Sequence, residues 1–150
     1  MGKLARWLRM MGFDSLFFTG EDDSQMVTQA LAEDRILLTR DTGIMKRRVV
    51  TNGRLKAVLF TDEEPEHQMR QLMSEMDLKS PSRPFTVCLE CNQPLVEVTP
   101  ADVKDRVPPY IYKTQTRYVA CPACRRVYWR GTHWAAMLRR LVKLADMQEN

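Results

Sequence analysis

The sequence predicts a mixed α/β protein: a parallel sheet flanked by helices, followed by a small four-cysteine module and a C-terminal helix. Two observations lead to this fold class. Apolar segments with strand and helix spacing alternate over residues 1–78, which is typical of a parallel α/β sheet. The only four cysteines of the 150-residue chain then occur as two C-x-x-C pairs. We therefore predict an α/β domain over residues 1–80 and a metal-bound module with a basic helix over residues 81–150.

The elements of the first part follow from apolar spacing and from turn residues. Leu4, Trp7, Leu8 and Met11 recur at the helical interval, and Gly12 is a natural stop. The short apolar runs that follow are typical of buried parallel strands. We expect, in order, a helix over 2–11, a strand over 13–18, a helix over 24–33 capped by Asp23, a strand over 36–39, a short basic helix over 44–50, a strand over 56–60 and a helix over 64–76.

The second part begins after Ser80-Pro81-Ser82-Arg83-Pro84, which is typical of a linker. Short strands are expected around the cysteine turns, and a segment with three prolines is expected to be a loop. We place strands at 85–87, 95–99, 117–120 and 127–129, the loop at 99–109, and a last helix from Thr132 to about Leu144.

The two cysteine pairs, Cys88 with Cys91 and Cys121 with Cys124, are the strongest chemical signal. Thiolates three positions apart in a tight turn can grip one side of a tetrahedral ion, so two pairs complete a four-cysteine site. This pattern predicts structural zinc in a zinc ribbon with a long insertion between the pairs. Iron suits the same all-sulfur geometry and stays open. Two disulfides are disfavoured, because nothing in the sequence indicates secretion.

The distribution of charge indicates an anionic partner. The chain carries a formal net charge of +4. Between Arg106 and Ala145 there is no acidic residue, and tyrosines and tryptophans alternate with basic residues. Basic side chains neutralise phosphates and aromatic rings stack on unpaired bases, so this composition favours a nucleic-acid surface. The alternative is a solvated basic face with a few aromatic residues in the core. The basic residues are Arg106, Lys113, Arg117, Arg125, Arg126, Arg130, Arg139, Arg140 and Lys143.

We expect a cytoplasmic protein without a membrane segment. No apolar run approaches the roughly 20 residues that span a bilayer. The N-terminal residues alternate basic and apolar side chains and form a poor signal peptide.

Carboxylates are the best candidates for chemistry in the first part. Asp23 lies at the predicted start of a helix, and Asp41 lies just past a predicted buried strand. Both positions fall on the edge of a parallel sheet where ligands bind. Carboxylates that converge there can hold Mg²⁺ or Mn²⁺, which can activate water against a phosphodiester. The competing explanation is that Asp23 is a helix cap and Asp41 a turn residue. His133, beside a helix start, is either a local turn residue or a site residue, and His67 is expected to be exposed.

Five motifs, in this order, resemble those of the PIN-like ribonuclease domain with a C-terminal zinc ribbon, known as the Mut-seven C-terminal RNase domain family. The motifs are GKLARWLRMMGFD, DDSQMV, RILLTRD, C-x-x-CN and C-x-x-CRRVYWRGTHW. The resemblance covers nearly the whole chain. It implies a PIN-like fold and metal-dependent cleavage of RNA.

The resemblance also implies roles for particular residues. Asp41, in the TRD motif, looks like one metal-binding acid, and Asp23 looks like a second, with Asp22 as a substitute. Thr39 is similar to the hydroxyl residue that orients the site. Lys3 and Arg6 are expected to face the scissile phosphate. The ribbon is expected to place Arg125, Arg126, Arg130 and His133 against RNA.

One departure from the family pattern concerns the first residues. Family members normally begin with a strand that ends in an Asp, just before GKLARWLR, and no residues of this sequence match that strand. We expect this to weaken the catalytic metal site and to open the middle of the sheet. An alternative function is therefore a catalytically inactive zinc-ribbon protein that binds RNA. A toxin under antitoxin control is a third possibility without specific support.

Overall fold

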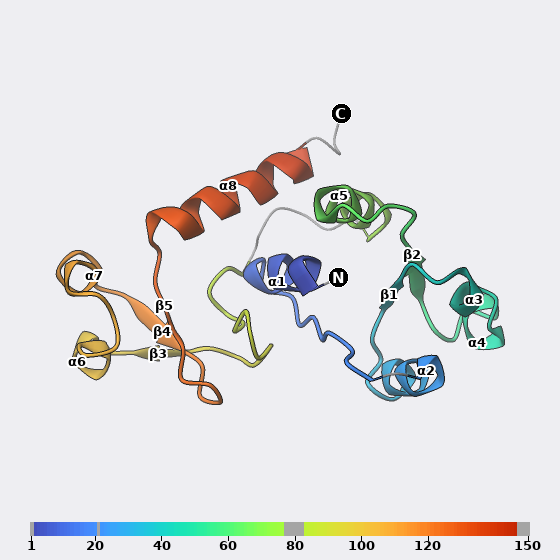
Figure 1. The fold of residues 1–150 in the computed structure, drawn as a ribbon, viewed down its shortest axis with the longest axis horizontal. Coiled ribbons are helices and arrows are strands. Elements are labelled where there is room, and N and C mark those ends of the chain that lie inside the picture. Colours follow the sequence, from blue (N-terminus) through green and yellow to red (C-terminus); the bar gives the residue numbers. More distant parts are fainter. Residues whose placement is uncertain (1, 21, 77–82, 147–150) are drawn as a thin grey trace.

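A computed structural model describes residues 2–20, 22–76 and 83–146, and it shows a mixed α/β fold with a small parallel sheet (Figure 1). The sheet lies in the first part of the chain, and a three-stranded antiparallel sheet lies in the second part. The first-part elements are α1 (Gly2–Met10), α2 (Asp23–Ala32), β1 (Leu37–Thr39), α3 (Thr42–Met45), α4 (Arg48–Thr51), β2 (Ala57–Leu59) and α5 (Pro65–Met76). The second-part elements are β3 (Val96–Val98), α6 (Pro100–Val103), α7 (Pro109–Thr114), β4 (Tyr118–Ala120), β5 (Val127–Tyr128) and α8 (Thr132–Asp146).

The mixed α/β class is confirmed, and most elements lie where apolar spacing predicted them. The parallel sheet pairs β1 with β2, with Leu38 opposite Val58. The cap of α2 differs from the prediction: the side chain of Asp22, not of Asp23, accepts a hydrogen bond from the amide of Ser24. The predicted basic helix over 44–50 forms two short helices, α3 and α4, which meet at Arg47.

The predicted strand over 13–18 is wrong. This segment is not part of a sheet, and Leu16 and Phe17 are exposed. A cavity of about 710 Å³ lies beside it, lined by residues 13–18, by 35–40, and by side chains of α1, α2 and α5. Because an extended segment becomes a strand only when a neighbouring backbone accepts its hydrogen bonds, the residues 13–18 remain irregular despite their apolar composition.

Two further expectations in the second part need correction. The proline-rich segment predicted as a loop begins with helix α6. Thr99 and Asp102 cap this helix reciprocally, and Pro100 occupies its first turn. Residues 85–87 do not form a strand; instead Val87 makes an isolated bridge to Pro94. The predicted linker and the boundary at 80/81 lie mostly outside the described residues.

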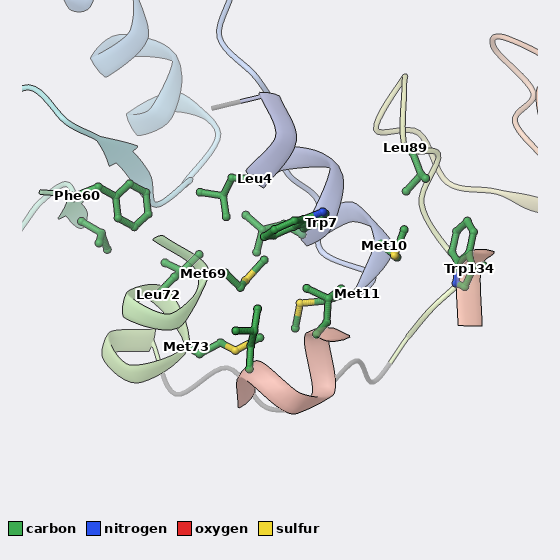
Figure 2. Packing of buried hydrophobic residues seen from close by; sticks show 14 residues of the cluster. Leu4, Trp7, Met10, Met11, Phe60, Met69, Leu72, Met73, Leu89 and Trp134 are labelled. Carbon is green, nitrogen blue, oxygen red and sulfur yellow. The ribbon is translucent and has the colours of Figure 1, made fainter. Parts of the chain in front are cut away.

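One hydrophobic cluster, which we call the central cluster, joins the two parts of the chain. Figure 2 shows Trp7 of α1 and Met11, which directly follows α1, facing Met69 and Met73 of α5, with Trp134 of α8 nearby. Helix α8 packs on α5, and α5 packs on α1. The buried members are Leu4, Trp7, Leu8, Met10, Met11, Val58, Phe60, Met69, Leu72, Met73, Leu89, Trp134, Leu141 and Leu144.

Two smaller clusters support the outer elements. The first packs α2 against β1 through Val27, Ala30 and Leu37. The second holds α6 and α7 on β4 through Val103 and Tyr118, among others. Among the described residues, no helix combines the length and the apolar character needed to cross a membrane.

Candidate metal centre and nucleic-acid interface

The four cysteines lie together in what we call the cysteine site. Their Sγ atoms are all within 4.8 Å of one another, Cys88 and Cys121 are buried, and all four thiols are free. The Sγ atoms of Cys88 and Cys124 are 3.7 Å apart. Zn–S bonds of about 2.3 Å in a tetrahedron place sulfurs about 3.8 Å apart, whereas a disulfide joins them at about 2 Å. The cysteines are therefore placed to hold a metal ion, and their geometry fits zinc.

The two cysteine turns have the same backbone geometry. In the first knuckle (88–93) the amide of Cys88 donates to the carbonyl of Gln93. In the second knuckle (121–126) the amide of Cys121 donates to the carbonyl of Arg126. Each knuckle bends through a residue with positive φ directly after its second cysteine. Within each knuckle the Sγ atom of the first cysteine accepts from the amide of the second. The repeated geometry presents four sulfurs to a single ion.

The thiols differ in their readiness to ionise. The amide of Arg126, the strongest influence on Cys124, lowers the pKa of that thiol to about 6. A hydrogen bond with Cys124 is the main reason why the pKa of Cys91 rises to about 12. A metal ion binds thiolates, so the lowered pKa of Cys124 favours the form of this side chain that coordinates an ion.

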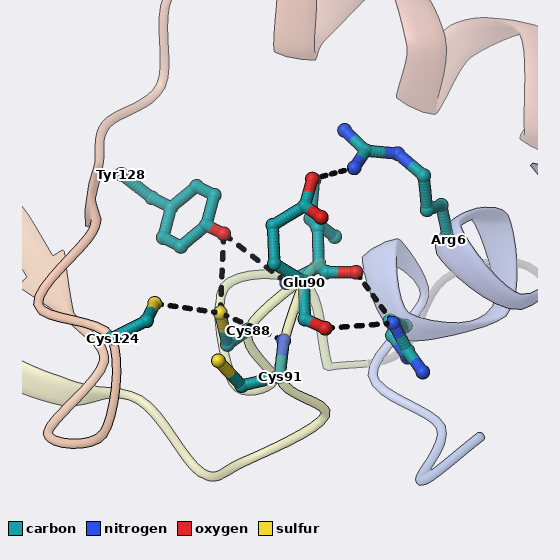
Figure 3. Close-up of polar contacts among 8 residues, drawn as sticks. Arg6, Cys88, Glu90, Cys91, Cys124 and Tyr128 are labelled. Carbon is teal, nitrogen blue, oxygen red and sulfur yellow. Dashed lines mark hydrogen bonds and ion pairs between the residues drawn. The ribbon is translucent and has the colours of Figure 1, made fainter. Parts of the chain in front are cut away.

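Tyr128 of β5 contacts the cysteine site through its hydroxyl group (Figure 3). Its hydroxyl lies 3.2 Å from the Sγ atom of Cys88 and accepts a hydrogen bond from the amide of Leu89 at 3.3 Å. Groups that hydrogen-bond a ligand orient it and tune its affinity for the metal. The sequence indicated this tyrosine as one of the aromatic residues of the nucleic-acid surface, not as a support of the metal site.

Tyr128→Phe should weaken metal binding about 10- to 100-fold, the usual effect of losing such a contact. The variant also leaves the amide of Leu89 without its hydrogen-bond acceptor, the Tyr128 hydroxyl. Competition with a chromophoric chelator measures the affinity. Tyr112→Phe, a partly buried tyrosine that packs against the cluster of α6 and α7, is the matched control and should bind metal like the unmodified protein. An unchanged affinity in Tyr128→Phe would show that the hydroxyl does not support the site.

Two of the predicted catalytic residues lie at the carboxyl end of β1: Thr39 is its last residue and Asp41 follows it. Asp41 follows β1 and caps α3, because its Oδ1 atom accepts from the amide of Gly43 at 2.8 Å. The hydroxyl of buried Thr39 accepts from the amide of Asp41 at 3.0 Å and so fixes the turn. A Cβ atom on Gly43 would lie 3.1 Å from Oδ1 of Asp41, so a larger residue there would press on the carboxylate.

Asp23 stands in the first turn of α2, exposed. The guanidinium of Arg47, at the start of α4, donates to the hydroxyl of Ser24 at 3.2 Å. This contact joins the beginning of α2 to the link between α3 and α4. Asp41 lies at the start of α3, one short helix before that link. Within the described residues, however, the four cysteines are the only group of three or more possible ligands close enough to hold one ion. No three carboxylates of these residues come that close together near Asp23 and Asp41.

Asp62 is a residue at the same edge that the sequence reasoning did not single out. It follows β2 much as Asp41 follows β1, so the rule that selected Asp41 applies to it equally. Its carboxylate accepts from the amide of Glu64 and contacts Nδ1 of His67 at 2.6 Å. These two groups lower the pKa of Asp62. His67 is exposed, as expected, and Asp62 remains ionised beside it.

The residues expected to contact RNA are exposed, and three of them, Arg6, Arg125 and Arg126, lie at the cysteine knuckles. Arg125 and Arg126 belong to the second knuckle, and Arg130 and His133 lie where β5 leads into α8. Arg6 of α1 pairs with Glu90 of the first knuckle (Figure 3). The Nζ atom of Lys3 and the guanidinium of Arg140 lie 5.4 and 5.8 Å from the centre of the Trp7 ring.

The aromatic residues of the basic stretch divide between core and surface. Tyr118 and Trp134 are buried, and Trp134 stacks on Phe85 with ring centres 3.9 Å apart. Tyr110 is 68% exposed. The guanidinium of Arg130 lies 5.2 Å from the Phe85 ring. Fewer rings are therefore free to stack on bases than the sequence suggested, and charge is the larger part of this surface.

Comparison with family models shows a match between residues 1–141 and the Mut7-C RNAse domain. Searches among curated proteins and among solved structures gave no significant match.

Proposed function

The chain belongs to the Mut7-C RNAse domain family, and on that premise we propose that it is a metal-dependent ribonuclease with a PIN-like fold that acts in the cytoplasm. The family match over 94% of the chain (141 of 150 residues) carries this proposal. The mixed α/β fold, with acids beyond the carboxyl ends of β1 and β2, supports it. A divalent ion at this edge would supply a Lewis acid for the attack of water on a phosphodiester.

In this proposal Asp41 and Asp23 provide carboxylate oxygens, and Thr39 holds Asp41 in place. Only Oδ1 of Asp41 is engaged in capping α3, so Oδ2 is left to face a cation. Zinc at the cysteine site folds the ribbon, and the basic residues around it hold the RNA backbone. We propose Lys3, Arg6, Arg125, Arg126, Arg130 and His133 for this contact.

The test compares RNA cleavage with Mn²⁺ by the unmodified protein and by Asp41→Asn. Asparagine keeps an oxygen that caps α3, so stability should hardly change, while cleavage should fall at least roughly a hundredfold because a charged ligand is lost. Asp34→Asn is the matched control: Asp34 is exposed, and its φ of 54° suits asparagine. Equal rates in the Asp41→Asn and unmodified proteins would remove Asp41 from the proposal.

A second candidate function is RNA binding without cleavage. The observation that favours it is that three carboxylates do not converge within the described residues. This candidate requires RNA binding that weakens steeply with salt, because phosphate contacts release counterions. It also requires that Mn²⁺ produce no cleavage in the unmodified protein, which the same assay measures.

A further inference from the structure

Arg9 connects the N-terminal half of the protein to the first knuckle. Its side chain is buried at the end of α1, with 7% of the residue exposed. The Nε atom donates to the carbonyl of Ser15 at 2.8 Å. The Nη1 atom donates to the carbonyl of Leu89 at 2.6 Å and to that of Glu90 at 3.5 Å. A buried guanidinium needs such acceptors, and two of the three lie between the cysteines of the first knuckle.

Asn92 makes a second connection between the same two segments. It directly follows Cys91 and supplies the bend of the first knuckle, with a φ of 60°. Its Oδ1 atom accepts from the amide of Ser15 at 2.8 Å, and its Nδ2 atom donates to Oδ1 of Asp14 at 2.5 Å. Both ends of the amide are therefore used to hold residues 14 and 15.

Asp14 extends the connection to the parallel sheet. Its carboxylate accepts two hydrogen bonds from Arg35, at 3.0 and 3.3 Å, and Arg35 lies just before β1. Partial burial alone would raise the pKa of Asp14, but the hydrogen bonds from Arg35 and Asn92 outweigh it and lower that pKa. Asp14 is consequently an ionised acceptor at neutral pH.

We propose that Arg9 and Asn92 are positioning residues that make the order of residues 13–20 depend on metal at the cysteine site. Metal fixes the first knuckle, and the knuckle fixes the carbonyls and the amide side chain that these contacts need. Residues 13–20 have no strand pairing among the described residues, and a cavity of about 710 Å³ lies beside them. The side-chain hydrogen bonds of this segment fall on residues 14 and 15 and come from Arg9, from Asn92 of the knuckle and from Arg35.

The consequence for catalysis rests on the proposed ribonuclease function. Residues 13–20 lead toward α2, which carries Asp23 at its start. A loss of metal in the ribbon would then disturb a proposed catalytic acid although neither Asp23 nor Asp41 touches a cysteine. The order of residues 13–20 can be measured directly, so the test does not depend on nuclease activity.

Amide hydrogen exchange of the full chain tests the proposal in the metal-loaded protein, the chelated protein and metal-loaded Asn92→Gly. Glycine accepts the positive φ but removes both side-chain contacts. Exchange at the Ser15 amide and across 13–20 should rise about tenfold or more in Asn92→Gly, as it should after chelation. Exchange across β1 and β2 should not change in the variant. Cobalt substitution should give the same four-thiolate spectrum as in the unmodified protein, which shows that the metal site itself is intact.

The matched control is Asn52→Gly. Asn52 also uses its side chain in a turn, accepting from the amide of Arg54 at 3.0 Å, but it lies far along the chain from the knuckle. This variant should leave exchange across 13–20 unchanged. If metal-loaded Asn92→Gly protects residues 13–20 as well as the unmodified protein does, the proposal is wrong, whatever chelation does to the rest of the fold.

A charge exchange separates this positioning role from a general loss of packing. Asn92→Asp places a second carboxylate against Asp14 and should loosen residues 13–20. Adding Asp14→Asn lets the amide at position 14 donate to the carboxylate at position 92, which reverses the original donor and acceptor. Protection of the Ser15 amide should therefore return in the double variant. Failure of this rescue, with the cobalt spectrum unchanged, would overturn the proposed contact. These exchange measurements use the protein without RNA. A failure to cleave RNA in the nuclease assay would therefore not change their outcome.

Discussion

Cys121→Ser is expected to abolish stable metal binding and to unfold the ribbon that contains β3, β4 and β5. Cys121 is 1% exposed, and its sulfur is one of four that surround a single point. A hydroxyl is a poor ligand for zinc beside three thiolates. Metal binding in small zinc modules contributes about 10–16 kcal/mol to folding, which is the whole stability of the module. Losing one ligand should therefore remove most of the structure around the site.

The three-stranded sheet with α6 and α7 has little else to replace the metal. The cluster under α6 and α7 contains only four buried side chains: Val103, Val107, Ile111 and Tyr118. A cluster of this size does not offset the conformational entropy of a module of some 45 residues. Once the ion is lost, we expect the strands to lose their register and the amides of 96–98 and 118–120 to exchange rapidly.

Metal analysis of the purified protein, thiol titration and exchange of the β3–β5 amides measure this outcome. Ala123→Ser is the matched control, because it adds a hydroxyl at an exposed position of the same knuckle and keeps all four thiols. The control should retain about one equivalent of metal. A Cys121→Ser protein with a full equivalent of metal and a protected ribbon would refute the four-cysteine assignment. The same metal analysis distinguishes zinc from iron.

The sequence predicted those features that depend on local pattern. Helix α1 follows from the spacing of Leu4, Trp7, Leu8 and Met11, and its end follows from Gly12. In the structure Gly12 has a φ of 98°, and a Cβ atom there would overlap the backbone of Arg83. The cysteine site was also predictable, because paired thiolates with this spacing have few other uses. These signals require no knowledge of distant parts of the chain.

Features that depend on tertiary partners were not predictable in the same way. Residues 13–18 have the composition of a strand, but no neighbouring strand accepts their hydrogen bonds in the described structure. Arg9 falls on the polar side of the apolar helix pattern, and yet it is buried by the first knuckle, some 80 residues away. Helix α6 was missed for another reason: the three prolines of residues 99–109 suggested a loop, although Thr99, Pro100 and Asp102 together form a helix start.

Trp7→Ala should lower the stability of the whole chain by about 3–5 kcal/mol, the usual cost of emptying a large aromatic site in a core. The ring is 4% exposed at the centre of the central cluster, and two cations, Lys3 and Arg140, lie over it. Total stabilities of about 5–15 kcal/mol make this a large fraction. For 150 residues the melting temperature should fall by about 10 °C or more.

The position of Trp7 also determines how the two parts of the chain unfold. The central cluster contains residues of α1, β2 and α5 together with Leu89 of the first knuckle and three side chains of α8. Once Trp7 is replaced, fluorescence comes from Trp129 and Trp134, both in the second part. Far-UV circular dichroism reports mainly on the helices. Both signals should shift to the same lower denaturant concentration in Trp7→Ala, because one shared core cannot be weakened for one part alone. The control is Trp129→Ala, because Trp129 is partly buried at the edge of the cluster under α6 and α7. This variant should lose less than half as much free energy of unfolding as Trp7→Ala. A Trp7→Ala transition that splits, with the tryptophan fluorescence unmoved, would show instead that the second part is stable without the N-terminal half.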